Sequence, residues 1–119
     1  MKKIIIIDDS EVIRKLVKRT LEETGFSVET ANNGEEGLQL VTNKHFDLII
    51  SDIHMPKMDG FEFVAKTRKL PNYIFTPILI LTTEMSLEQK EIGQKMGATG
   101  WMVKPITPDL LVRTIKRVL

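Results

Sequence analysis

The chain contains no cysteine among its 119 residues. This absence excludes a disulfide framework and any metal site that uses cysteine as a ligand. Disulfides form and persist in oxidising compartments, so a chain without cysteine is compatible with a reducing one. We therefore expect a cytoplasmic protein.

The sequence also lacks an excess of either charge and any long hydrophobic run. Lysine and arginine number 17 against 16 aspartates and glutamates, which gives a formal net charge of +1. Nothing in this balance requires a nucleic acid or an anionic membrane surface. The apolar run at residues 4–7 is too short for a signal peptide or a membrane span. We expect neither nucleic acid nor membrane as a direct partner.

Aromatic residues are scarce, at 6% of the chain, and Trp101 is the only tryptophan. The hydrophobic fraction of 42% and the charged fraction of 28% are nevertheless ordinary for a folded globular protein. A chain of this length can bury a core without disulfides or a structural metal. We expect residues 1–119 to form a single domain.

Four short apolar runs each lead into a polar residue. Residues 4–7 precede Asp8 and Asp9, residues 46–50 precede Ser51 and Asp52, residues 78–81 precede Thr82, and residues 101–103 precede Lys104 and Pro105. Short runs rich in β-branched residues predict strands that are buried on both faces, as in a parallel sheet. Residues 26–31 alternate between apolar and polar side chains, which predicts an edge strand.

Helix signals separate these strands. Apolar residues recur at helical spacing within residues 10–24, namely at Val12, Ile13, Leu16, Val17 and Leu21. Further helices are predicted at residues 34–43, after the N-cap Asp59 with Phe61, Val64 and Ala65 inward, at residues 86–96, and after Thr107-Pro108. Five alternations of strand and helix predict an α/β protein, a flavodoxin-like (βα)5 three-layer sandwich whose parallel sheet has the strand order 2-1-3-4-5.

This strand order places the first strand beside the third, so Asp8, Asp9 and Asp52 should meet at the carboxyl edge of the sheet. Open α/β sheets bind ligands outside that edge. Two carboxylates ~4 Å apart repel each other by about 4 kcal/mol at an effective dielectric constant near 20. A hard cation would offset this repulsion, and Mg²⁺ characteristically takes one or two carboxylates and keeps several waters.

The same edge should carry a hydroxyl from Thr82 and an ammonium from Lys104. A divalent cation with these two groups can hold the oxygens of a phosphoryl group, and phosphoryl transfer needs mainly such positioning and charge neutralisation. A carboxylate can itself be the nucleophile. Asp52 is the best candidate, because it lies on the central strand between the acidic pair and Thr82.

These residues resemble the motifs of response-regulator receiver domains, of the stand-alone, chemotaxis CheY-like type. The resemblance covers the whole chain. It rests on the pair Asp8-Asp9, on Asp52-x-x-Met55-Pro56-x-Met58-Asp59-Gly60, on Thr82 and on Lys104-Pro105, in that order and spacing. It implies a signalling switch that catalyses only its own phosphorylation and dephosphorylation.

The resemblance also implies a role for each site residue. Asp52 would accept a phosphoryl group from a phosphohistidine. Mg²⁺ would be bound by Asp9, Asp52 and the backbone carbonyl of His54, with Asp8 acting mostly through water. Lys104 would pair with the phosphoryl group or its acceptor carboxylate, and Thr82 would donate a hydrogen bond to it. The peptide between Lys104 and Pro105 would be cis.

Three further positions follow from the family pattern. Trp101 stands where receivers usually have a smaller aromatic residue or histidine that turns inward when the threonine moves, so Thr82 and Trp101 are the expected switch pair. An inward rotamer of so large a side chain could be hindered. His54 and Glu84 would border the attacking water and tune the lifetime of the phosphorylated state.

Three functions compete at this point. The leading one is two-component signal transduction, with a histidine kinase or histidine phosphotransfer protein as donor. The downstream protein target would bind the last helices and strand, and we expect a monomer. The first alternative is a Mg²⁺-dependent phosphohydrolase with an aspartyl-phosphate intermediate, but Ile53 and His54 follow Asp52 where such an enzyme needs a second aspartate. The other is a flavodoxin-like cofactor binder, which the lack of a glycine-rich turn after the first strand disfavours.

Overall fold

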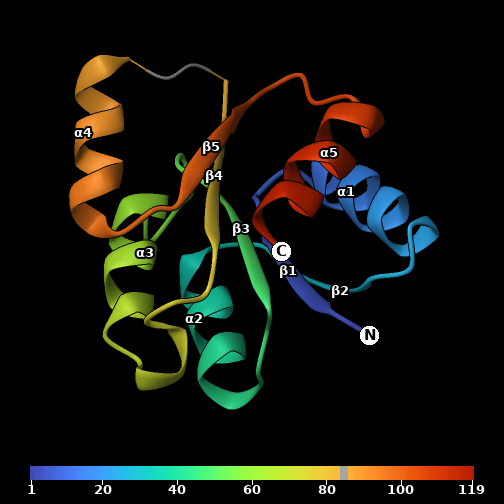
Figure 1. The fold of residues 1–119 in the computed structure, drawn as a ribbon. Coiled ribbons are helices and arrows are strands. Elements are labelled where there is room, and N and C mark those ends of the chain that lie inside the picture. The colour runs from blue at the N-terminus through green and yellow to red at the C-terminus, as the bar shows by residue number, and fades with distance from the viewer. Residues whose placement is uncertain (84–85) are drawn as a thin grey trace.

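The structure is a computed structural model that describes residues 1–83 and 86–119. Five strands and five helices alternate along these described residues (Figure 1). The strands are β1 (Lys3–Ile7), β2 (Ser27–Ala31), β3 (Leu48–Asp52), β4 (Ile78–Thr82) and β5 (Gly100–Val103). The helices are α1 (Glu11–Glu23), α2 (Gly34–Asn43), α3 (Gly60–Arg68), α4 (Leu87–Met96) and α5 (Pro108–Val118), with a short 3₁₀ turn, η1 (Pro71–Tyr73), before β4.

All the strand pairs are parallel, and the sheet has the order β2-β1-β3-β4-β5. The predicted flavodoxin-like order is therefore confirmed. Ile7 of β1 lies opposite Ser51 of β3, and Asp52 lies opposite Leu81 of β4. The polar residues that follow the apolar runs thus gather at one edge of the sheet, as parallel pairing requires.

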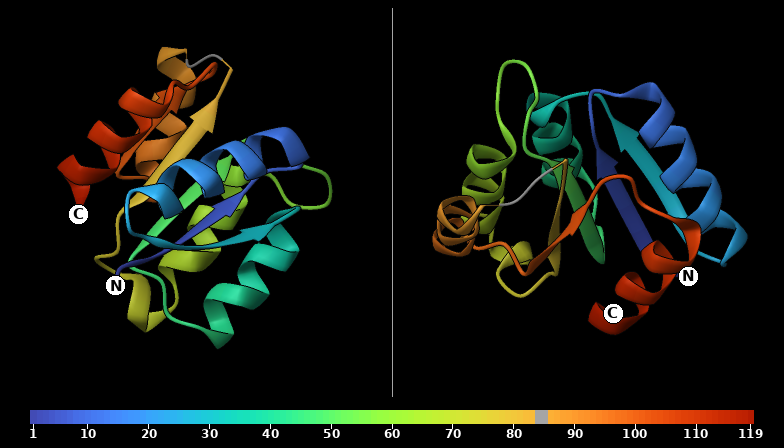
Figure 2. Two further views of the ribbon diagram at one scale, coloured as in Figure 1. Left: turned by 90° about the vertical axis from the view of Figure 1, so that its right-hand side faces the viewer. Right: turned by 90° about the horizontal axis from the view of Figure 1, so that it is seen from above.

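Helices cover both faces of the sheet, with α1 and α5 on one side and α2, α3 and α4 on the other (Figure 2). The strand β1 explains why helices are needed on both faces of the sheet, because its side chains are buried on both sides. Ile4 and Ile6 belong to the core beneath α1 and α5, whereas Ile5 and Ile7 belong to the core on the opposite face. Alternation along one strand thus supplies two apolar cores.

The helices begin where the sequence supplies caps. Ser10, Asn33, Asp59, Ser86 and Thr107 each accept a hydrogen bond from a backbone N–H in the first turn of the following helix. Such caps satisfy donors that have no partner inside the helix and typically contribute about 1 kcal/mol each. Ser86 and Gln89 form the reciprocal capping box that their spacing predicts.

Two details of the predicted helices are wrong. Val12 is 74% exposed, although it was expected on the apolar stripe of α1. It precedes the inward-facing Ile13 by one residue, which turns its side chain about 100° around the helix. In α3 the fully buried apolar side chains are Phe63 and Val64, and Phe61 is only partly buried.

None of the helices in the described part of the chain combines the length and the apolar character needed to cross a bilayer.

Candidate phosphoryl and metal site

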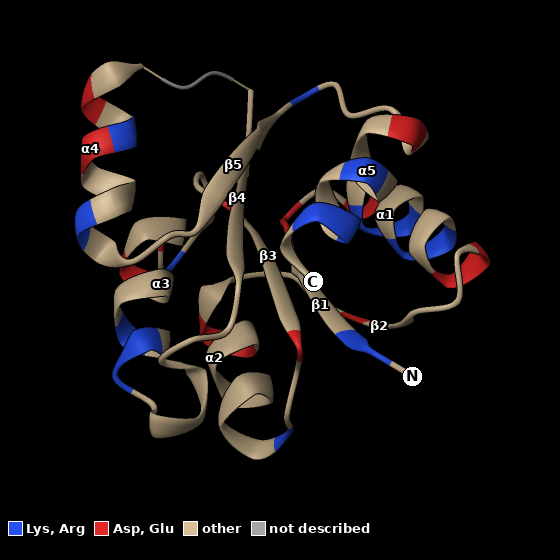
Figure 3. Ribbon diagram, in the orientation of Figure 1, with Lys and Arg blue, Asp and Glu red and all other residues tan. Residues whose placement is uncertain are grey.

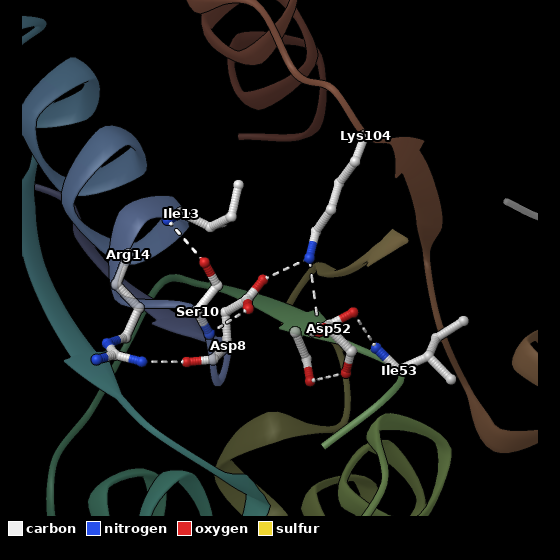
Figure 4. Close-up of polar contacts among 8 residues, drawn as sticks. Asp8, Ser10, Ile13, Arg14, Asp52, Ile53 and Lys104 are labelled. Atoms are coloured by element: carbon white, nitrogen blue, oxygen red, sulfur yellow. Dashed lines mark hydrogen bonds and ion pairs between the residues drawn. The ribbon is translucent and has the colours of Figure 1, made fainter. Parts of the chain in front are cut away.

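Three aspartates and one lysine lie together at the carboxyl edge of the sheet. Figure 4 shows Lys104 reaching toward two of these aspartates, Asp8 and Asp52. Asp8 follows β1 and is fully buried, Asp9 is exposed, and Asp52 ends β3 with 5% of its surface exposed. One carboxylate oxygen from each aspartate lies within 4.8 Å of the other two. Lys104 reaches this group from the segment after β5.

Lys104 forms ion pairs with two of the three aspartates. Its Nζ lies 2.9 Å from Asp8 Oδ2 and 3.5 Å from Asp52 Oδ2. The backbone fixes its starting point, because the Lys104 N–H donates to the carbonyl oxygen of Thr82 at 2.6 Å. This bond places the residue that ends β4 and the lysine that follows β5 side by side. The Lys104–Pro105 peptide is cis, as predicted.

Local hydrogen bonds hold Asp8. Its Oδ1 accepts a hydrogen bond from the backbone N–H of Ser10 at 2.9 Å, and its carbonyl oxygen accepts one from Arg14 Nη1 at 2.6 Å. Arg14 was not predicted to belong to the site; its signal is its position one helical turn after Ser10, where the side chain can reach back to the end of β1.

Asp8 Oδ2 is buried, and among the described residues its polar contact is the ion pair with the Lys104 ammonium at 2.9 Å.

The surroundings of Asp52 disfavour the negatively charged form of its carboxyl. Its Oδ1 accepts a hydrogen bond from the backbone N–H of Ile53 at 2.8 Å. Burial raises the pKa of the Asp52 carboxyl above its ordinary value, and the charge of Asp8 raises it further, while Lys104 and the Ile53 N–H act in the opposite direction. One lysine thus leaves the three acids incompletely neutralised.

This donor set suits a hard divalent cation. Carboxylate oxygens are the ligands that Mg²⁺ prefers, and three carboxylates converge here, one of which has a buried oxygen, Asp8 Oδ2, without a hydrogen bond from a described residue. A cation at this position would relieve the repulsion that raises the pKa of Asp52. The geometry therefore fits a divalent metal next to the carboxylate of Asp52.

The other predicted residues have different surroundings. Thr82 is fully buried at the end of β4, and His54 is exposed in the loop after β3. Trp101 is half-buried on β5, with the ammonium of Lys90 5.2 Å from the centre of its ring. Glu84 lies outside the described residues. The roles assigned to these four residues stay predictions.

Gly60 also shapes the site, although its sequence signal was only its place in the family motif. The Gly60 N–H donates to the carbonyl oxygen of Ile53 at 2.8 Å. A Cβ atom at this position would press against the carbonyl oxygen of Asp52 and lie 2.8 Å from the Ile53 Cα. Only glycine lets the start of α3 approach the backbone of Asp52 so closely.

Comparison with known proteins agrees with this geometry. The family model described as the response regulator receiver domain matches residues 4–116. The solved structure of the chemotaxis protein CheY4 of Vibrio cholerae is 51% identical, covers 100% of this chain and 99% of its own, and superposes with a TM-score of 0.98.

Two curated relatives are longer proteins. The alkaline phosphatase synthesis transcriptional regulatory protein PhoP of Bacillus subtilis is 36% identical over 99% of this chain and 48% of its own length. The sensor histidine kinase RcsC of Escherichia coli is 30% identical over 94% of this chain and 12% of its own length. The chain spans about half the length of the first curated relatives, at 56%, 45% and 48%. The chain therefore belongs to the response regulator receiver domain family, whose members serve two-component signal transduction.

Proposed function

We propose that this receiver domain is switched by a phosphoryl group that Asp52 accepts from a phosphohistidine of a histidine kinase or histidine phosphotransfer protein. The observation that carries the proposal is the convergence of three carboxylates within 4.8 Å, with the Lys104 ammonium 2.9 Å from one and 3.5 Å from another. This arrangement supplies a nucleophile, a metal site and a fixed cation in one place.

In the transfer step, a carboxylate oxygen of Asp52 forms a bond to phosphorus. The bond between phosphorus and the imidazole nitrogen of the donor breaks, and its electron pair returns to the imidazole, which can then take up a proton. Asp52 must be ionised to attack, and Lys104 stabilises the ionised form. Lys104 also faces the negative charge of the phosphoryl oxygens.

Asp8, Asp9, Asp52 and the backbone carbonyl of His54 would hold the Mg²⁺, with Asp8 acting mostly through water. Bound there, Mg²⁺ supplies positive charge against the phosphoryl oxygens. The Thr82 hydroxyl would donate a hydrogen bond to the phosphoryl group, because Thr82 ends the strand next to Asp52. In the dephosphorylation step a water would attack the phosphorus, and the bond between phosphorus and the Asp52 oxygen would break. Inorganic phosphate would leave, Asp52 would return to its free carboxylate, and His54 and Glu84 would set the rate of that step.

The output would be a change in protein binding. We place the target-binding surface on β5, α5 and α4, and we expect residues 1–119 to act as one monomeric domain in the cytoplasm. A chemotaxis role is proposed from the similarity to the V. cholerae chemotaxis protein. Acidic and basic residues both lie along α4 (Figure 3), so this surface is not uniformly basic, which is why we assign the output to a protein rather than to a nucleic acid.

The alternative, a phosphohydrolase acting on external phosphoesters, is not favoured. The second residue after Asp52 is His54, where such an enzyme would place an aspartate as general acid. The family match and the relatives also lie among response regulators.

Incubation with acetyl phosphate and Mg²⁺ tests the proposal. Intact-mass spectrometry should show one added phosphoryl group on the wild-type chain and much less on Lys104→Ala or in the presence of EDTA. Turnover of an external phosphoester such as p-nitrophenyl phosphate should stay at background. Steady turnover without an accumulated phosphoprotein would favour the hydrolase.

A further inference from the structure

Among the five helices of the described residues, α4 has the fewest buried residues. Its only fully buried residue is Gly93, which has no side chain, whereas each of the other four helices buries at least two residues. Elements with few buried apolar contacts move at low free-energy cost. The described contacts outside the apolar cores therefore help to decide where α4 lies.

One such contact fixes the carboxyl end of α4. The guanidinium of Arg68, at the end of α3, donates from Nε to the carbonyl oxygen of Gly97 at 2.9 Å and from Nη1 to the carbonyl oxygens of Tyr73 and Thr76 at 2.6 Å each. Several bonds to one rigid, planar group tie this end of α4 firmly to α3 and to the segment before β4.

The second contact, near the middle of the helix, is weaker. Lys90 places its ammonium 5.2 Å from the ring centre of Trp101. Trp101 packs on the core face that α3 and α4 cover, and it pairs in register with Ile80 of β4. Among the described residues, Lys90 forms no ion pair within 4.0 Å, so the ring is its described partner.

We propose that Lys90 is a positioning residue, a latch that holds Trp101 in its present orientation and keeps the amino-terminal half of α4 close to β5. A cation over a tryptophan face is attracted by the ring's quadrupole, and indole is the strongest of the aromatic partners. An exposed cation–π contact is weak enough to open. It can still influence the position of α4, because this helix buries no large apolar side chain.

The consequence for signalling rests on the proposed function. Thr82 ends β4, next to the strand that carries Trp101, and its carbonyl is bonded to the Lys104 N–H. A phosphoryl group on Asp52 that recruits Thr82 and Lys104 would disturb the packing beside Trp101. Lys90 opposes that change by stabilising the unphosphorylated arrangement. Removing the latch should therefore favour the phosphorylated arrangement.

The first test needs no phosphorylation, because Trp101 is the only tryptophan. Acrylamide quenching of its fluorescence is measured in the wild type, Lys90→Met, Lys90→Arg and Lys95→Met. Lys95→Met is the matched control, since it removes the same charge from an exposed position on the same helix. The ratio of open to latched molecules should rise about two- to fivefold in Lys90→Met, the scale of one exposed cation–π contact.

Quenching should therefore increase in Lys90→Met, while Lys90→Arg should resemble the wild type and Lys95→Met should not change it. Equal quenching in the wild type and Lys90→Met would overturn the latch. The midpoint of thermal unfolding monitored by circular dichroism verifies that each variant is folded.

The second test titrates beryllium fluoride, a phosphoryl mimic, in the presence of Mg²⁺. Half-saturation in Lys90→Met should occur at a concentration about two- to fivefold lower than in the wild type, by the same factor that opens the latch. An unchanged half-saturation together with altered quenching would overturn the regulatory role of Lys90. Failure of the wild type to bind beryllium fluoride would instead count against the proposed function, and the quenching result would still decide the latch.

Discussion

At the scale of single residues, Asp52 combines burial with proximity to another carboxylate. Both raise the pKa of its carboxyl above the ordinary value of 3.8. The folded protein therefore binds this proton more tightly than the unfolded chain does, so its protonation stabilises the fold. At neutral pH without a divalent cation, the ionised Asp52 works against folding.

Asp52→Asn should accordingly stabilise the metal-free protein at pH 7.5 by about 1–2 kcal/mol, within the range usual for single substitutions. The advantage should shrink as pH falls through the raised pKa of Asp52 and vanish below 3.8, where both states are protonated. Urea unfolding in EDTA at several pH values measures this. A stability difference that stays constant across the range would contradict the assignment of the shift to Asp52.

Lys57 stores backbone strain in the loop that leads from Asp52 to α3. Its φ is 71°, and the Met58 N–H donates to the carbonyl oxygen of Pro56 at 2.8 Å, the pattern of a tight γ-turn. Its ion pair with Glu35, at 3.9 Å, joins two exposed side chains and contributes little.

Lys57→Gly should raise the free energy of unfolding by about 0.5–1 kcal/mol, because glycine adopts this φ without steric cost but loses more entropy on folding. Lys57→Ala is the matched control, since it removes the charge and keeps the Cβ atom. Urea denaturation that shows the same gain for alanine would assign the effect to the charge instead.

At the scale of helices and strands, Gly60 and Gly93 differ in whether the structure has room for a Cβ atom. A Cβ atom at Gly60 would meet the backbone of Asp52 and Ile53, which cannot yield without moving the site. A Cβ atom at Gly93, within α4, would lie 3.4 Å from a ring carbon of Phe61, which is ordinary contact.

Gly60→Ala should therefore lower the free energy of unfolding by about 2–3 kcal/mol, the upper part of the range for point substitutions, and weaken phosphorylation. Gly93→Ala should raise it by up to about 1 kcal/mol through helix propensity. Denaturation curves of the pair provide the comparison. A Gly60→Ala protein as stable as the wild type would show that α3 does not depend on this close approach.

The fold's elements were predictable because their signals are local. Strand runs such as residues 4–7 are continuous and β-branched, and side-chain caps such as Ser10 and Asp59 mark the helix starts. The faces of short helices were less predictable. Which residues of α1 or α3 face the sheet depends on how the helix docks on it. For this reason Val12 was wrongly predicted to face inward and the buried Phe63 was not predicted.

The site was predictable because parallel strands bring the ends of their apolar runs to one edge. Contacts that join distant segments through side chains were not. Within residues 1–83 and 86–119, Arg68 donates only to carbonyl and hydroxyl oxygens of later segments, and Lys90 contacts Trp101 across two elements. No periodicity or spacing in the sequence signals either contact.

At the scale of the whole molecule, the clustered carboxylates predict that a divalent cation stabilises the fold. Mg²⁺ that binds the native state and not the unfolded chain shifts unfolding by mass action. The midpoint of thermal unfolding should rise by a few degrees at a Mg²⁺ concentration well above the dissociation constant. Asp9→Ala should lose most of this rise, because it removes the exposed ligand and leaves the buried core intact. A wild-type midpoint that Mg²⁺ does not change, or an equal rise in Asp9→Ala, would contradict the metal site.

The central claim is that Asp52 carries the phosphoryl group. Borohydride reduces an aspartyl phosphate to homoserine, so treatment of the acetyl-phosphate-labelled protein, followed by peptide mass spectrometry, locates the acceptor directly. The account predicts homoserine at position 52 only, and none in Asp52→Asn. Homoserine at position 8 or 9 of the wild type, or stoichiometric labelling of Asp52→Asn, would contradict it.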